Sequence, residues 1–186
     1  MTRTGTTELL AAPLGTVRAG RLSFVRGASQ LKIGVDGSME DLYHARFDGK
    51  VPDVHVEGDR VVVKYRPSLH VPHGEIVLSG RIPWRIEGRM GMSHVVAELE
   101  DVELTGFEIG GGASDIELRL PRPTTTVPIR FGGGASKLEV IRPAGVPVRV
   151  RVGSGASELT IDGFHLAAGG GAIDHRSPDY DAASER

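Results

Sequence analysis

The chain has 186 residues, of which 39% are hydrophobic and only 5% aromatic, and it carries a net charge of −2. This near-neutral balance lacks the excess of basic residues that nucleic-acid binding usually needs. Because the sequence has no cysteine, disulfides and thiolate metal sites are excluded. A core built from these residues must come mainly from Val, Ile, Leu and Ala, which suit strands.

Residues 1–15 form the first predicted segment. Glu8 to Ala12 fit one short helical turn, which would cap the first rung of a repeat, or an ordered tail. The segment lacks the basic and then apolar layout of a signal peptide, and no apolar run reaches the roughly 20 residues of a membrane-spanning helix. We therefore expect a cytoplasmic protein, with membrane contact at most peripheral.

A Gly-Ala-Ser tripeptide, with one Gly-Met-Ser variant, recurs along the chain. Its serines are separated by 64, 21, 22 and 21 residues, and 64 is close to three times 21. The spacing predicts repeating turns of about 21 residues, with two degenerate turns near residues 50 and 72. The predicted structural corners are Gly27, Ser29, Gly91, Ser93, Gly112, Ser114, Gly134, Ser136, Gly155 and Ser157.

Apolar and polar residues alternate on both sides of these corners. After the corner, segments such as Lys137 to Val140 read polar, apolar, polar, apolar, and before it segments such as Val146 to Val150 alternate in the same way. A period of two indicates a strand with one buried face. Each turn thus holds at least two strands, and glycine at the corner allows positive φ and close approach of successive backbones.

The pattern predicts a single-domain, all-β fold, a β-solenoid over residues 16–174, because stacked turns bury an apolar face that one turn cannot bury alone. A sandwich or barrel is the alternative. Between the repeats, Gly58 and Asp59 are flanked by valines and are compatible with a tight turn between paired strands. Residues 175–186 are predicted to be a polar tail.

His70, His73 and Glu75 are weak candidates for a zinc site. Their spacing suits a turn better than one strand face, so a surface loop is the preferred interpretation, and we predict no metal and no cofactor. A serine repeated at five corners argues against a nucleophile and for a stacked structural ladder. An acidic groove of a carbohydrate-active enzyme would need paired carboxylates, and the nearest cluster, around Asp36, is better explained as a loop.

Two further predictions concern the strand that precedes each corner. Arg85, Glu108, Arg130 and Arg149 should occupy one column, where mixed charges neutralise each other across turns. The alternative is a face for an acidic partner or for anionic lipid headgroups. The single tryptophan, Trp84, should point into the core with Ile82 and Ile86.

The glycine corner, the Val-Pro-x-Arg strand and the Gly-Ala-Ser-x-Leu strand together resemble the bacterial toastrack, or DUF4097-type, adhesin domains. They also resemble the C-terminal part of LiaF-like envelope-stress proteins, and by architecture alone the bactofilins, which polymerise end to end. The resemblance covers residues 80–174 and, loosely, residues 20–79. It implies a β-solenoid-like fold without assigned catalytic residues, often found beside membrane-spanning segments, which this sequence lacks.

The sequence therefore predicts a non-enzymatic scaffold or interaction protein, which self-associates through its end rungs or binds a protein partner. No small-molecule substrate is evident. The alternative is a binding or sensor module linked to envelope stress, contacting a protein or a membrane, with a non-repeating patch within residues 39–80.

Overall fold

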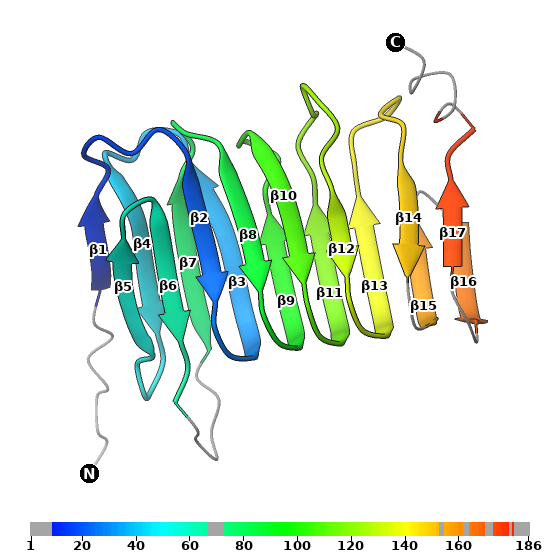
Figure 1. The fold of residues 1–186 in the computed structure, drawn as a ribbon, viewed down its shortest axis with the longest axis horizontal. Coiled ribbons are helices and arrows are strands. Elements are labelled where there is room, and N and C mark those ends of the chain that lie inside the picture. The colour runs from blue at the N-terminus through cyan, green and yellow to red at the C-terminus, as the bar shows by residue number, and fades with distance from the viewer. Residues whose placement is uncertain are drawn as a thin grey trace.

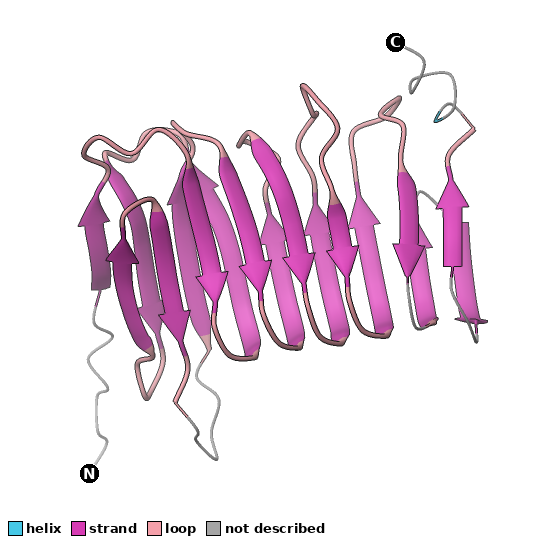
Figure 2. Cartoon of the chain, viewed as in Figure 1, coloured by secondary structure: helices cyan, strands magenta, loops and turns pink. Residues whose placement is uncertain are grey.

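The computed structural model describes residues 9–66, 73–152, 155–161, 164–169, 173–178 and 180. These residues form an all-β fold of two facing sheets, as Figures 1 and 2 show. In spatial order, sheet A contains β1 (Leu9–Pro13), β4 (Asp41–Phe47), β7 (Gly74–Ser79), β3 (Ala28–Asp36), β9 (Met92–Glu98), β11 (Ala113–Arg119), β13 (Ala135–Ile141), β15 (Ala156–Ile161) and β16 (Phe164–Gly169).

Sheet B faces sheet A, and its strands are ordered from the same end of the molecule. Its spatial order is β5 (Asp53–Glu57), β6 (Arg60–Lys64), β2 (Gly20–Phe24), β8 (Trp84–Gly88), β10 (Leu104–Ile109), β12 (Ile129–Phe131), β14 (Arg149–Val152) and β17 (Ile173–Arg176). From β7 to β15 in sheet A and from β6 to β14 in sheet B, neighbouring strands pair in parallel. Strand β4 pairs antiparallel with both β1 and β7, and the edge strands β5, β16 and β17 also pair antiparallel. The chain passes from sheet B to sheet A at each glycine corner, for example from β10 to β11 (Figure 1).

The predicted repeat is visible in the register of sheet A. Ala113 pairs with Ala135, and Ala135 pairs with Ala156, so equivalent residues of the 21-residue and 22-residue repeats stand side by side. Inward residues such as Ile116, Leu138 and Leu159 are almost completely buried. The alternation of apolar and polar residues therefore indicated the buried face of these strands correctly.

The prediction of a degenerate turn near residue 50 is wrong, and the second predicted turn, near residue 72, lies outside the described residues. Strand β3 pairs directly with β9, although 64 residues separate their serines. The intervening chain instead extends both sheets beyond β2 and β3, where β6 pairs with β2 and β7 pairs with β3. The 64-residue gap matches three periods only by coincidence. Residue 50 lies between β4 and β5.

Two local predictions have clear outcomes. Gly58, with φ of +64°, lies in the tight turn of the β5–β6 hairpin, which confirms that turn. Leu9 to Ala12 form part of β1 rather than a helical turn, because their backbones pair with β4. Glu8, at the start of that predicted turn, lies outside the described residues.

The predicted polar tail begins too early. His175 and Arg176 belong to β17, and the Ser177 side chain is buried and accepts a hydrogen bond from the Val148 backbone N–H at 2.9 Å. Polar residues are tolerated in β17 because it is an edge strand that pairs antiparallel with β14. The polar composition alone therefore did not reveal this strand.

Trp84 lies in the core, as predicted, with no exposed surface. Its indole Nε1–H donates a hydrogen bond to the Ser79 backbone carbonyl at 2.8 Å. The ring packs directly on Gly20, where a Cβ atom would approach the indole to 2.7 Å. Gly20 therefore makes room for the largest side chain of the core.

Candidate functional site

The glycine corners bring successive backbones into close contact. A Cβ atom on Gly27 would lie 2.9 Å from the Gly91 carbonyl oxygen, and one on Gly91 would lie 3.0 Å from that of Gly112. The backbone N–H of Met92 donates to this Gly112 oxygen at 3.0 Å, and Ala113 donates to Gly134 in the same way. Gly27 and Gly91 thus have little room for a side chain between stacked turns, whereas a Cβ atom on Gly112 would lie 3.6 Å from the Gly134 oxygen, an ordinary contact.

Positive φ occurs at a different position from the one predicted. Of the five corner glycines, only Gly155 has positive φ. The left-handed conformation is instead adopted by the residue that follows each serine, with φ between 50° and 56°: Gln30, His94, Asp115, Lys137 and Glu158. The sequence did not reveal this conformation, because a polar residue is equally expected at the exposed position of a regular strand.

The left-handed residue interrupts the pairing of each strand at a fixed point. In the β11–β13 ladder, Ser114 pairs with Ser136 and Ile116 pairs with Leu138, while Asp115 and Lys137 are skipped. A non-glycine residue in this conformation costs about 1 kcal/mol or more. Repetition of this strain at every corner shows that it belongs to the fold rather than to one site.

The corner serines form a ladder along sheet A. The Ser93 hydroxyl donates to Ser29 Oγ at 2.8 Å, and the Ser157 hydroxyl donates to Ser136 Oγ at 3.2 Å. Ser114 pairs in register with both Ser93 and Ser136. Among the described residues, Ser29, Ser93, Ser136 and Ser157 thus each have another serine as side-chain hydrogen-bond partner. A structural ladder explains this arrangement.

An open hollow of about 560 Å³ lies where the repeats meet the inserted strands. The pairing of β7 with β3 begins at Leu31, which pairs with Gly74. Gln30, which precedes Leu31, therefore has no ladder partner on β7. His73 and Glu75 line this hollow, whereas His70 lies outside the described residues. The other lining residues are Gln30, Leu31, Lys32, Arg46, Asp48, Gly74 and His94.

The hollow combines both signs of charge. Lys32 forms an ion pair of 2.9 Å with Glu98, which raises the pKa of the lysine. The Asp48 backbone N–H, directly after β4, donates a hydrogen bond to the His73 carbonyl oxygen at 2.9 Å and so ties His73 to the end of that strand. Within the described part of the chain, no group of three or more His, Asp or Glu side chains is arranged to hold a metal ion.

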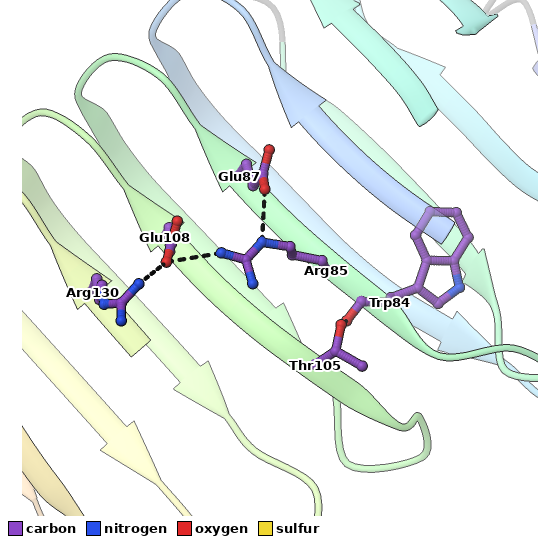
Figure 3. Close-up of polar contacts among 6 residues, drawn as sticks. All are labelled: Trp84, Arg85, Glu87, Thr105, Glu108 and Arg130. Atoms are coloured by element: carbon purple, nitrogen blue, oxygen red, sulfur yellow. Dashed lines mark hydrogen bonds and ion pairs between the residues drawn. The ribbon is translucent and has the colours of Figure 1, made fainter. Parts of the chain in front are cut away.

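Charged side chains on the outer face of sheet B form a network (Figure 3). Arg85 binds Glu87 at 2.7 Å and Glu108 at 2.9 Å, and Arg130 binds the same Glu108 oxygen at 2.7 Å. Although partial burial opposes it, hydrogen bonds from the two arginines lower the pKa of Glu108. The predicted neutralisation across turns is therefore present.

The predicted single column is only partly correct. Glu108 pairs in register with Arg130 and with Glu87, whereas Arg85 pairs with Gly106 and so stands two residues away. Arg149 likewise stands two residues before Arg151 and binds Asp174, with 2.8 Å between Nε and Oδ1. The prediction placed these residues on the correct face but missed the offset, which follows from the pairing of β8 with β10.

The end of the molecule formed by β1 and β5 exposes large apolar side chains. Leu9, on β1, is 46% exposed, and Val56, on β5, is 39% exposed. Val56 pairs with the fully buried Val61, so it faces the interior and reaches solvent at the edge of sheet B. Leu10 and Val54 are partly buried against the core beside them.

The comparisons with known proteins support the fold. No family model and no curated protein matches the chain. A solved structure of a "putative cell adhesion protein" from Clostridium sporogenes matches with a TM-score of 0.60 and 18% sequence identity, covering 90% of this chain and 86% of that one. This likeness shows a shared fold. No helix among the described residues is long and apolar enough to cross a membrane.

Proposed function

We propose that this chain is a two-sheet β-solenoid that works as a non-enzymatic interaction protein and associates with a second copy through the end formed by β1 and β5. The observation that carries the proposal is the exposure of Leu9 and Val56 on the two edge strands of that end. The structural neighbour with an adhesion-type description is compatible with an interaction role.

The solenoid interpretation rests on the path of the chain. Strands β8, β10, β12 and β14 each lead through a corner into the next strand of sheet A, and both sheets advance by one parallel strand per repeat. The repeated serine and glycine positions stack in register. This path supports the proposal of a solenoid, in which each repeat contacts its neighbours.

Edge strands carry backbone N–H and C=O groups that can pair with another chain. A two-fold axis perpendicular to both sheets would place β1 against β1 of the second copy and β5 against β5, each pair antiparallel. One axis would thus continue both sheets at once, as an isologous interface requires. The same contact would cover Val56 and the partly buried Leu10 and Val54.

Sedimentation velocity over a range of protein concentrations tests the proposal, with Leu9→Lys and Val56→Lys as variants. We expect a dimer for the unmodified chain and a shift to monomer for both variants, because a charge on an edge strand opposes pairing. Met90→Lys and Ile141→Lys are matched controls, since Met90 and Ile141 are exposed apolar residues away from this end. A monomer at every concentration would contradict self-association.

The second candidate function is a binding or sensor module linked to envelope stress. It is favoured by the hollow beside Gln30, which takes Arg46, Asp48, His73 and Glu75 from the non-repeating part of the chain. A strictly monomeric protein would favour this function. Its test is then binding of a partner that is lost in Arg46→Glu but retained in Arg119→Glu.

A further inference from the structure

A second hollow, of about 470 Å³, lies on the outer face of sheet B over β12 and β14. Three arginines and one tyrosine contribute to its wall, and no carboxylate is among the described residues that line it. The lining residues are Thr126, Pro128, Ile129, Arg130, Phe131, Gly132, Arg149, Arg151 and Tyr180. In contrast, the hollow beside Gln30 contains two carboxylates, so the arginine hollow is the more basic of the two.

Arg130 and Arg151 stand on neighbouring strands. Phe131 pairs with Val152, so each of these arginines lies one residue before a matched pair, on the face opposite the core. Parallel strands are about 4.8 Å apart, which places the two arginines as direct neighbours. Their side chains are 70% and 65% exposed, so both guanidinium groups are accessible from solvent.

Both arginines retain donors for a ligand. Arg130 uses Nη1 for Glu108 at 2.7 Å, and the Arg151 Nε atom lies 3.7 Å from Asp174, too far for a hydrogen bond. A guanidinium group has five N–H donors. With respect to the described residues, most of the donors of this pair are therefore available, and Asp174 and Glu108 compensate only part of the positive charge.

Arg149 forms the fixed base of the hollow. Its Nε donates to Asp174 Oδ1 at 2.8 Å, and contact with Asp174 and then with Tyr180 raises the pKa of the arginine. Arg149 is also the least exposed of the three arginines, at 22%. It therefore adds a positioned, less exposed charge to the two accessible guanidinium groups.

The geometry points to a binding site for a phosphate ester, with the phosphate held between Arg130 and Arg151. The planar arginine fork matches the oxygens of a phosphate group and binds them in pairs of charge-assisted hydrogen bonds. Two forks on adjacent strands can hold one phosphate from both sides. The ester arises either from a free phosphorylated small molecule or from a lipid headgroup.

Two probes with the same headgroup chemistry test the site. Titration calorimetry at low salt measures binding of glycerol 1-phosphate, and vesicle flotation measures binding to phosphatidylcholine vesicles with and without phosphatidic acid. We expect saturable binding of at least one probe. Binding of the vesicles alone identifies a lipid source, and binding of the free ester identifies a soluble one. If neither probe binds, the proposal is overturned.

Variants separate this site from the general charge of the protein. Arg130→Gln and Arg151→Gln should each weaken binding about tenfold, because each removes one charged fork from the phosphate. Arg119→Gln, which changes the net charge equally but lies on sheet A, should leave the affinity unchanged. Equal weakening by all three variants would show charge attraction without a site and would overturn the proposal. Circular dichroism confirms that each variant is folded.

Discussion

The hydroxyl groups of Ser29 and Ser93 are hydrogen bonded at 2.8 Å, although 64 residues separate them in sequence. The contact shows that β3 and β9 are direct neighbours and that the chain between them leaves the repeat and returns. It also joins the first turn of the serine ladder to the later ones.

A double-mutant cycle measures this contact. Ser29→Ala and Ser93→Ala should each lower the free energy of unfolding, with a coupling of about 0.5–1 kcal/mol between them, because either change removes the same hydrogen bond. Unfolding is followed by the fluorescence of Trp84, the only tryptophan, which is fully buried. Strictly additive effects would show that the two hydroxyls do not interact.

Substitution of Gly111, which directly precedes the corner glycine Gly112, should be costly. A Cβ atom on Gly111 would lie 2.5 Å from the Gly91 backbone nitrogen, so Gly111→Ala should destabilise the protein by about 2 kcal/mol through overpacking. The matched control is Gly34→Ala, in β3, where an added Cβ meets nothing within 4 Å. Chemical denaturation should show a stability of Gly34→Ala equal to or above that of the unmodified chain, and equal losses would contradict the close approach.

Among the described residues, the buried hydroxyl of Tyr65 has no hydrogen-bond partner, and burial raises its pKa. An unsatisfied buried hydroxyl lowers stability, so Tyr65→Phe should raise the free energy of unfolding by about 1 kcal/mol. The aromatic ring, which packs edge-on against Phe47, is retained. Tyr65→Leu removes both the ring and the hydroxyl and should instead destabilise. A loss of stability in Tyr65→Phe would indicate a hydrogen bond to water.

Asp174 should make the stability depend on pH at the acidic end. The hydrogen bond from Arg149 lowers the pKa of this carboxyl to about 2, below its ordinary value of 3.8. Its contribution is therefore complete above about pH 4 and is lost as the pH falls toward 2. Urea unfolding midpoints measured between pH 2 and 5 should fall less steeply for Asp174→Asn than for the unmodified chain. Parallel curves would show that the ion pair does not form in solution.

The sequence predicted the all-β class, the repeat and the buried position of Trp84 because each depends on a local period of two or on exact spacing. It did not predict the pairing of β3 with β9, because two segments related by a repeat carry no signal that separates neighbours from distant copies. The positive φ of His94 and Asp115 was also hidden, since polar residues suit both conformations.

The candidate sites could be predicted less completely from the sequence. His73 and Glu75 were singled out, but the hollow they line also contains Gln30, Arg46 and His94, which come from separate strands. The exposed end depends on β1, and the sequence predicted a helical turn or an ordered tail for Glu8 to Ala12, which overlap this strand. Only pairing with β4 decides its conformation, and that pairing is a long-range property.

The return of the chain from β7 to β8 has a consequence for the order of folding. Closing a loop of 64 residues instead of 21 costs about 1 kcal/mol more in chain entropy. The later turns, which close short loops, should therefore form before β3 meets β9, even though the ribosome releases the early strands first. We thus expect the N-terminal third of the nascent chain to remain incompletely paired until the strands that follow it have been synthesised.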